Sequence, residues 1–436
     1  MTLRRMLSMV LGLLGLRVGG AILNLLSQVI FAHIFAPAEV GVIFLSMSTA
    51  AFFGLVGTVG YPWLALTQMP RFEALGLKRI VHAFHGAFLR DGLLCLILLC
   101  VACFAASMVL DLSPATKTAL LFGCLAAPAS VLMRYGSSMA NSLRRFTLSY
   151  APDFITRPSL LLIYIVTVSF FGVRMSMTHG LIAFIIVLYM VSFAQASALG
   201  KQGPLPSDMA LAKPNLTKAL RPRAVSLAIV ALVATSFADL VTMIAGFLLP
   251  SDQLAVLAVT VRLAAMAGFI IQVAQQFILP DLTAALTKRN APAAHSLLFR
   301  LNLMTIATIV ACLFGAALLG KFALSIFGET YVAGQSLLMA LMLGQSIRAF
   351  SGMNQQLLSI ANFQARTAGA CLVAFAVLLL GSIFASQYYG MLGIGYAVIT
   401  AELAWSLILG YQAQTLTGSR GDIFWLLKTK PSSVAL

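Results

Sequence analysis

The sequence predicts an all-α polytopic membrane protein with about 12 transmembrane helices in two parallel six-helix repeats around a central cavity. Of its 436 residues, 61% are hydrophobic and only 9% are charged, whereas soluble domains carry about 25% charged residues. Apolar stretches of about 20 residues recur along the whole chain, and two short motifs return at nearly the same spacing. Few period-2 strand patterns occur, so a helical bundle is predicted and not a β-barrel.

The apolar stretches have the length that a helix needs to cross the hydrocarbon core of a bilayer. The first six cover residues 8–35, 41–64, 87–109, 118–138, 154–173 and 179–199. The second six cover residues 224–249, 254–279, 299–320, 334–357, 368–386 and 390–411. The first stretch is too long for the apolar core of a signal peptide, and no small-residue cleavage site follows it. We therefore count it as a span.

Two motifs indicate an internal duplication. The corner Pro37–Glu39 returns as Pro250–Asp252, 213 residues later, and Met133–Met139 returns as Ile347–Met353, 214 residues later. A duplicated unit about half as long as the chain is the usual construction of membrane transporters. Because each half has an even number of spans, both halves enter the membrane in the same direction, with a cavity between them.

The distribution of Lys and Arg predicts the orientation. With the N-terminus inside the cell, 21 of the 28 Lys and Arg residues lie in cytoplasmic segments and 3 lie in outer connections, as the positive-inside rule requires. We expect an N-terminal lobe of residues 1–199, a cytoplasmic linker 200–223, a C-terminal lobe 224–411 and a cytoplasmic tail 412–436. The net charge of +16 then indicates contact with anionic membrane lipid and gives no support to nucleic-acid binding.

Metal, cofactor and enzyme chemistry have little support in the sequence. All six cysteines lie within apolar spans, where they act as small hydrophobic residues. His82 and His85 could share a helix face, but no third metal ligand is near them in the sequence. We expect no metal site, no cofactor and no catalytic residue. The longest outer connection, 320–333, is short for the catalytic loop of a membrane-embedded polymerase or ligase.

Four arginines lie well inside predicted spans: Arg17, Arg134, Arg262 and Arg348. Each costs roughly 2.5–3.5 kcal/mol at the centre of a span, and an arginine cannot give up its proton. Polar residues at helical spacing share their faces: Gly20, Asn24 and Gln28 with Arg17; Ser137, Ser138 and Asn141 with Arg134; Gln272 and Gln276 with Arg262; Gln345, Gly352 and Gln356 with Arg348. These stripes predict a water-filled interior path.

Two acids also lie in spans. Asp239 shares a stripe with Thr235 and Thr242 and lies about as far as Arg262 from the corner at Pro250. This spacing fits either a structural ion pair or a site for a coupling cation or proton. Glu402 is a second candidate for such a site. With four interior arginines and two interior acids, the path has a surplus of two positive charges, which suits an anionic cargo such as a pyrophosphate better than a cationic drug.

A family resemblance adds to this interpretation. The corner Phe31–Gly41, the run to Gly60-Tyr61-Pro62 and the two six-helix repeats resemble the polysaccharide transporters of the multidrug/oligosaccharidyl-lipid/polysaccharide (MOP) superfamily. Val40 stands where that family usually has an aromatic residue. The drug-exporting branch often carries an acid on the first span, where this chain offers Asn24.

The resemblance implies a flippase of the cell inner membrane. It would move a polyprenyl-pyrophosphate-linked oligosaccharide to the outer leaflet for exopolysaccharide, capsule or O-antigen synthesis, through rocking of two lobes about a V-shaped cavity coupled to a cation or proton gradient. A polysaccharide polymerase or glycosyltransferases would be its functional partners. The residues expected to bind substrate are Arg17, Asn24, Gln28, Arg134, Asn141 and Arg348, and those expected to couple the ion are Asp239, Arg262 and Glu402.

Three alternatives stay open at the level of sequence. A multidrug exporter of the same superfamily, driven by cation antiport, would have the same architecture. A membrane-embedded polysaccharide polymerase or ligase, or a scaffold that transports nothing, would also be rich in apolar spans. The short outer connections argue against the enzyme, and the polar stripes argue against the scaffold.

Overall fold

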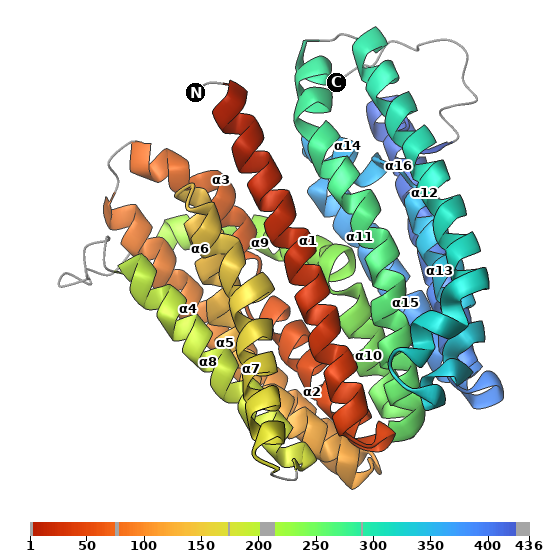
Figure 1. Ribbon diagram of the computed structural model, residues 1–436. Helices are drawn as coiled ribbons and strands as arrows, with labels where there is room; N and C mark the ends of the chain where they lie inside the picture. The colour runs from red at the N-terminus through yellow and green to blue at the C-terminus, as the bar shows by residue number, and fades with distance from the viewer. Residues whose placement is uncertain (1–2, 75–77, 173–174, 201–213, 289–290, 424–436) are drawn as a thin grey trace. The chain divides into compact units, whose positions relative to one another are not determined.

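The computed structural model describes residues 3–74, 78–172, 175–200, 214–288 and 291–423 of the chain (Figure 1). All regular elements in these ranges are helices. The chain divides into two compact units, Met1–Met243 and Ile244–Leu436. The predicted all-α class is confirmed, and each unit can be described by itself.

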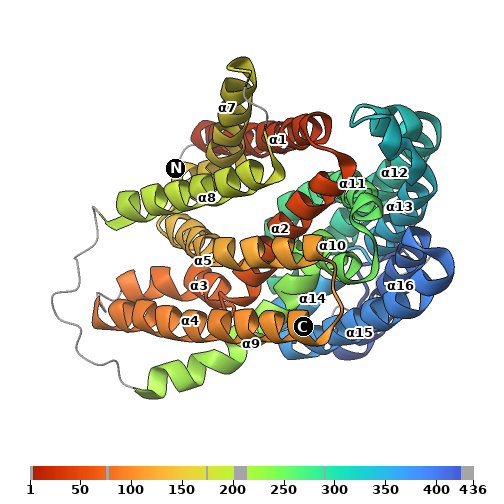
Figure 2. The same ribbon diagram turned by 90° about the horizontal axis from the view of Figure 1, so that it is seen from below.

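The first unit is built around α5. Its elements are α1 (Leu3–Ile34), α2 (Pro37–Val56), α3 (Tyr61–Ala74), α4 (Lys78–Val109), α5 (Pro114–Ser142), α6 (Phe146–Ala151), the π-helical turn η1 (Pro152–Thr156), α7 (Arg157–Phe170), α8 (Met177–Gly200), α9 (Pro214–Thr235) and the first part of α10 (Phe237–Leu248). Helix α5 contacts α2, α3, α4, α6 and α8. Figure 2 shows it between α8 and α3.

The second unit is built around α13 and α16. After the end of α10 it contains α11 (Ser251–Thr287), α12 (Ala291–Ser325), the 3-10 turn η2 (Glu329–Gly334), α13 (Gln335–Phe350), α14 (Asn354–Ile360), α15 (Gln364–Tyr389) and α16 (Met391–Thr417). Helix α13 contacts α11, α12 and α16, and α16 also lies along α15.

The twelve predicted spans all have helical counterparts. Within the described ranges, nine helices are long and apolar enough to cross a membrane, and the bent pair Ala224–Leu232 and Phe237–Leu248 would make a tenth. The first predicted span falls on α1. The part Val18–Ile34 of this helix is apolar, but it is shorter than the 18 residues of a full span. The tenth falls on α13 and α14, because the helix breaks after Phe350. A count of about twelve spans therefore fits the fold.

Both corners of the predicted repeat begin a helix. In α2, Pro37 occupies the first turn, where its missing N–H costs nothing, and the Glu39 carboxylate accepts a hydrogen bond from the N–H of Ala36 at 3.1 Å. Helix α11 begins at Ser251, directly after Pro250, with Asp252 in its first turn. An acid in the first turn stabilises the positive end of the helix dipole in each case. The similarity between the two corners in sequence is thus a similarity in helix initiation.

Helix α9 packs within the first unit. The sequence predicts a linker over residues 200–223 and a second lobe from residue 224, whereas α9 begins at Pro214 and contacts α2 and α3. Gly60, with φ +77°, permits this contact, since a Cβ at that position would overlap the carbonyl group of Ala224. Residues 201–213 of the predicted linker lie outside the described residues.

The surface of the helices carries the apolar side chains that a bilayer requires. Helix α4 is an example: within its span Ala83–Val109, large apolar side chains such as Leu93, Leu98 and Phe104 are exposed. Contiguous apolar surface of this kind is typical of contact with lipid and is rare on soluble proteins. The first unit also has apolar cores, one of which contains Tyr61 and Phe88.

Candidate functional site

The predicted polar stripe of α5 lines a pocket in the first unit. Arg134, Ser137, Ser138 and Asn141 all face the same pocket, which has a volume of about 210 Å³. The pocket is also lined by Leu55, Pro62, Trp63, Leu66, Met133, Ser149, Tyr150, Asp153, Phe154 and Thr235. The helical spacing seen in the sequence therefore corresponds to a shared concave surface.

The second wall of the pocket exists because the chain turns back at the end of α5. Arg144 has a positive φ of 59°, and α6 follows after one more residue. Helix α6 then continues into the π-helical turn Pro152–Thr156, whose wider winding carries Asp153 and Phe154 into the pocket lining. π-Helical turns are rare and are frequently found at functional sites.

Helix α1 packs directly on this turn at Gly20. A Cβ at Gly20 would overlap the Cβ and the carbonyl oxygen of Phe154, so only glycine permits the observed approach. Gly20 belongs to the predicted stripe of α1, and its observed role is to pack against the turn that lines the pocket. Further along that stripe, Gln28 is buried and its amide donates to Asn24 Oδ1 at 3.2 Å. Neither Asn24 nor Gln28 lines the pocket, and the side chain of Arg17 lies outside the described residues.

Hydrogen bonds between helices hold the polar wall in place. Ser149 Oγ donates to the carbonyl of Ser137 at 2.8 Å, and the amide of Gln195 on α8 donates to Ser137 Oγ at 3.0 Å. The same amide donates to the carbonyl of Leu148 at 2.9 Å. Gln195 is 2% exposed. It is not among the predicted site residues, although a side-chain amide within an apolar span indicates an interior position. It fixes α5, α6 and α8 relative to one another.

The guanidinium of Arg134 has little compensation in the part of the chain that the structure describes. Its one contact there is a long hydrogen bond of 3.4 Å from Nη2 to the carbonyl of Ala51, near the limit at which such a bond still contributes. No described carboxylate lies within 4.0 Å of the Arg134 guanidinium. Asp153, the acid in the pocket lining, pairs instead with Arg157 at 2.9 Å. Arg134 therefore presents a positive charge to a pocket lined by hydroxyl and amide groups.

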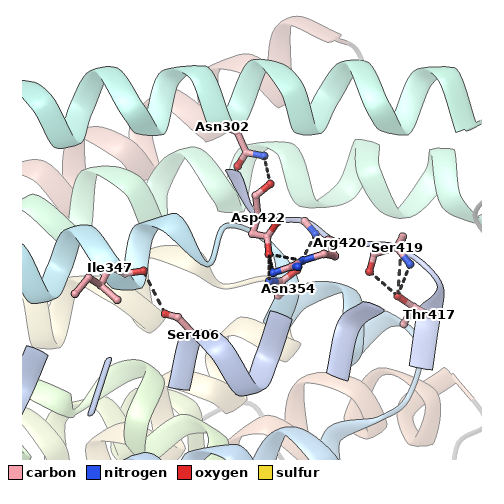
Figure 3. Close-up of polar contacts among 9 residues, drawn as sticks. Asn302, Ile347, Asn354, Ser406, Thr417, Ser419, Arg420 and Asp422 are labelled. Carbon is pink, nitrogen blue, oxygen red and sulfur yellow. Dashed lines mark hydrogen bonds and ion pairs between the residues drawn. The ribbon is translucent and has the colours of Figure 1, made fainter. Parts of the chain in front are cut away.

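The corresponding arginine of the second unit is in a different state. Arg348 Nη1 lies 3.2 Å from Glu402 Oε1, and Glu402 is only 1% exposed. The guanidinium also stacks over the Trp405 ring, 4.8 Å from its centroid. Beside this pair, Ser406 Oγ donates to the carbonyl of Ile347 at 3.2 Å and joins α16 to α13 (Figure 3). A predicted substrate residue and a predicted coupling residue thus form one buried ion pair.

The second carboxylate oxygen of Glu402 is less well compensated than the first. Glu402 Oε2 is buried and has no hydrogen-bond partner among the described residues, and the same holds for Trp405 Nε1. A buried acceptor without a partner is costly. The Glu402 carboxylate is therefore only partly compensated by the described residues.

The predicted pair of Asp239 and Arg262 belongs to different units. Asp239 lies in the first turn of α10, within the first unit, and Arg262 lies in α11 of the second unit. Both are half-buried, and Arg262 Nη1 donates to the carbonyl of Ala258 at 3.1 Å. Their pairing and their role in ion coupling stay predictions.

One buried acid was missed by the sequence analysis. Asp91 on α4 accepts hydrogen bonds from Tyr61 Oη at 2.8 Å, from Arg90 Nε at 3.0 Å and from Arg221, whose Nε and Nη2 lie at 2.9 and 2.7 Å. The hydrogen bonds to Asp91 raise the pKa of Arg221. The signal was present, since Asp91 is an acid within the predicted third span. Its basic partner comes from α9, 130 residues later, so only the tertiary structure identifies it.

The second unit contains a polar cluster after its last helix. We call residues 417–422 the C-terminal strap (Figure 3). Asn354, which is fully buried, donates to Asp422 Oδ2 at 3.2 Å and accepts from the N–H of Gly421 at 2.7 Å. Asn302 on α12 donates to the carbonyl of Asp422 at 3.0 Å, and Arg420 pairs with Asp422 at 2.7 Å. The strap therefore ties α12, α14 and the end of α16 together.

Groups suited to a metal are not apparent in the ranges that the structure describes. No three His, Cys, Asp or Glu side chains gather there as a metal site would require. The six cysteines are all free.

Comparisons with known proteins support the fold. No known protein-family profile matches the chain, and no curated protein matches it in sequence. Among solved structures, a multidrug resistance MATE family transporter of the MOP superfamily in its inward-facing conformation matches with a TM-score of 0.72 at 12% identity, covering 91% of this chain and 94% of that one. The lipid II flippase MurJ in an inward closed conformation matches with a TM-score of 0.65 at 15% identity, covering 93% and 87%.

A third structure extends this similarity. A MOP superfamily transporter from Pyrococcus furiosus matches with a TM-score of 0.56 at 11% identity, covering 93% of this chain and 95% of that one. At such low identities the similarity establishes the fold alone. The chain has the fold of MOP superfamily transporters, and the branch suggested by the sequence resemblance stays a prediction.

Proposed function

We propose that this multi-span membrane protein is a flippase that moves a pyrophosphate-linked lipid oligosaccharide from the inner to the outer leaflet of the cell inner membrane. The observation that carries the proposal is the pocket around Arg134. An arginine with no described carboxylate partner, surrounded by hydroxyl and amide groups inside an apolar bundle, is suited to an anion. The fold of known transporters and flippases supports a transport role.

The donors in the pocket fit a phosphate group. A guanidinium presents several N–H groups in a planar fork that matches phosphate oxygens, and such charge-assisted bonds are about twice as strong as neutral ones. Ser138 on α5 and Tyr150 on α6 add hydroxyl groups, and Asn141 adds an amide. The carboxylate in the lining, Asp153, is paired with Arg157 at 2.9 Å, so it offers a cationic cargo less than the Arg134 guanidinium offers an anion.

The size of the pocket limits what it can hold. Sites for drug-sized ligands usually measure about 300–1,000 Å³, whereas this pocket has about 210 Å³. It would therefore accept the pyrophosphate or one adjoining sugar, and the remaining sugars and the polyprenyl chain would lie outside it.

Coupling to a gradient is proposed for the second unit. Proton uptake by Glu402 would remove the charge that Arg348 faces at 3.2 Å, and neutralising one partner of a buried ion pair destabilises that state by about 3–5 kcal/mol. Such a change is large enough to shift the equilibrium between two conformations of a transporter. Asp239 and Arg262 remain the further candidates for ion coupling. Both termini would be cytoplasmic, and glycosyltransferases and a polysaccharide polymerase would supply and use the cargo.

A multidrug exporter driven by cation antiport is the second candidate. The observation in its favour is the similarity in fold to MATE transporters, which has the higher TM-score of 0.72. The two candidates differ in the charge of the cargo, so they can be separated by experiment. A cell that lacks the protein should lose surface polysaccharide under the first proposal and become sensitive to organic cations under the second.

The decisive variant is Arg134→Gln, compared with Arg134→Lys and with Arg300→Gln as a control. Arg300 is exposed on α12 and takes no part in the pocket. Losing a charge-assisted hydrogen bond of about 1.5–3 kcal/mol should weaken anion binding roughly 10- to 100-fold. We expect little surface polymer with Arg134→Gln, partial recovery with Arg134→Lys and normal polymer with the control, all at equal protein levels in the membrane. Normal polymer with Arg134→Gln would refute the role of the pocket.

A further inference from the structure

A second concave surface lies on the second unit, between the start of α15 and the end of α16. Its volume is about 380 Å³. Helix α16 contributes Leu407, Ile408, Tyr411, Gln412, Thr415 and Leu416, and α15 contributes Arg366. We call this surface the α15–α16 groove. Along α16 it extends over about 13 Å, from the rise of about 1.5 Å per residue.

The groove lies at one end of two membrane spans. Arg366 is the third residue of α15 (Gln364–Tyr389), and Thr415 is the third from the end of α16 (Met391–Thr417). Both helices are long and apolar enough to cross a bilayer. A side chain in the first turn of one span, beside the last turns of the other, lies at the level of the lipid headgroups.

The apolar part of the groove faces outward. Leu407 is 61% exposed and Tyr411 is 71% exposed, and in a membrane span such side chains contact acyl chains. Tyrosine is enriched at the boundary between headgroups and hydrocarbon, where its ring and hydroxyl meet different surroundings. Residues deeper on α16 are thus suited to an acyl chain, and those near the helix end are suited to a headgroup.

The charge of the groove is positive. Arg366 is exposed, and no carboxylate that the structure describes lies within 4.0 Å of its guanidinium. The backbone carbonyl of Arg366 accepts a hydrogen bond from the Gln412 amide at 3.3 Å. This bond joins α15 to α16 and does not use the Arg366 guanidinium. The guanidinium is therefore available to an anionic group at the membrane surface.

We propose that the α15–α16 groove binds one anionic glycerophospholipid. Its phosphate would contact the Arg366 guanidinium, and the first part of an acyl chain would lie along Leu407 and Ile408. The volume fits a headgroup with the beginning of its chains and is too small for a whole lipid. Basic pockets between transmembrane helices near the membrane surface recognise phospholipid headgroups in this way. The site does not depend on what the protein transports.

The test uses the full-length purified protein and native mass spectrometry in the presence of phosphatidylglycerol or phosphatidylcholine with identical acyl chains. We expect the wild-type protein to retain phosphatidylglycerol preferentially, and Arg366→Gln to bind it about tenfold more weakly. Arg300→Gln, which removes an exposed arginine elsewhere in the same unit, should leave the preference unchanged. Thr415→Trp, which fills the groove and keeps the charge, should also weaken binding.

Three outcomes would overturn the proposal. The first is an unchanged phosphatidylglycerol preference in both Arg366→Gln and Thr415→Trp. The second is an equal loss in Arg366→Gln and Arg300→Gln, which would indicate attraction to net charge and no groove. The third is equal retention of the two lipids by the wild-type protein. Circular dichroism of each variant checks that the helices are intact, and with two independent variants a single folding failure does not decide the result.

Discussion

The buried pair of Arg348 and Glu402 gives the sharpest prediction. Replacing Glu402 by Gln preserves the shape of the side chain and removes its charge. Arg348, whose side chain is only 15% exposed and stacks over the Trp405 ring, then stays charged without the Glu402 carboxylate to compensate it. Breaking a buried ion pair by removing one partner costs about 3–5 kcal/mol. Because Gln still offers an acceptor, we expect the lower end of that range, about 3 kcal/mol.

The complementary single variant is Arg348→Met. It leaves the Glu402 carboxylate, which is 1% exposed, without its basic partner, and we expect a loss of similar size. The double variant Arg348→Met with Glu402→Met removes both charges and fills a similar volume. Replacing a buried ion pair by apolar residues is often neutral or stabilising, so the double variant should be at least as stable as the wild-type protein.

The assay is unfolding of the purified protein in detergent micelles, followed by circular dichroism, for the wild-type protein and the three variants. The coupling free energy from the four measurements isolates the interaction of the pair. Single variants within about 1 kcal/mol of wild type would show that the pair is not engaged. A double variant that loses as much as the sum of the singles would refute the reasoning on charge burial. If the pair serves coupling, the stable double variant should still fail in transport.

Two further predictions concern packing. Gly60→Ala should lower the free energy of unfolding by more than about 2 kcal/mol, because a Cβ there meets the carbonyl of Ala224 and the residue has φ +77°. The control in the same unfolding assay is Gly86→Ala, where the added Cβ meets no neighbouring group within 4 Å. Asn354→Ala should cost about 1–3 kcal/mol, since it leaves the N–H of Gly421 without its acceptor. Faster hydrogen exchange in residues 417–422 would support this, and unchanged protection of the strap would contradict it.

Much of the fold could be predicted from the sequence. Hydrophobic stretches and the positions of Pro and Gly determine where spans begin and end, because these effects act over a few neighbouring residues. The corners at Pro37 and Pro250 illustrate this, since each begins a helix as expected. The break after Phe350 was not predicted. It depends on Gly352 at φ +56° and on the hydrogen bond from the N–H of Met353 to the carbonyl of Gly421, a partner in the distant strap.

The candidate site was predicted in part. Helical periodicity placed Arg134 and Asn141 on one face, and both line the pocket. The same periodicity treated Arg348 as equivalent to Arg134, but the structure pairs Arg348 with Glu402. The partner lies 54 residues away on another helix, and the spacing along one helix carries no information about it.

The helical membrane class, the positions of the spans and the spans that carry interior charge can all be predicted from the amino-acid sequence, because each follows from the solvation of a single helix in lipid. Which of these charges are compensated depends on how the helices pack. Arg134 faces a pocket that a π-helical turn helps to line, while Arg348 is paired with a carboxylate, and Asp91 is paired with an arginine from a helix far along the chain. The physical reason is that the energy of a buried charge depends on the groups within a few ångströms of it, and those groups are brought together by packing.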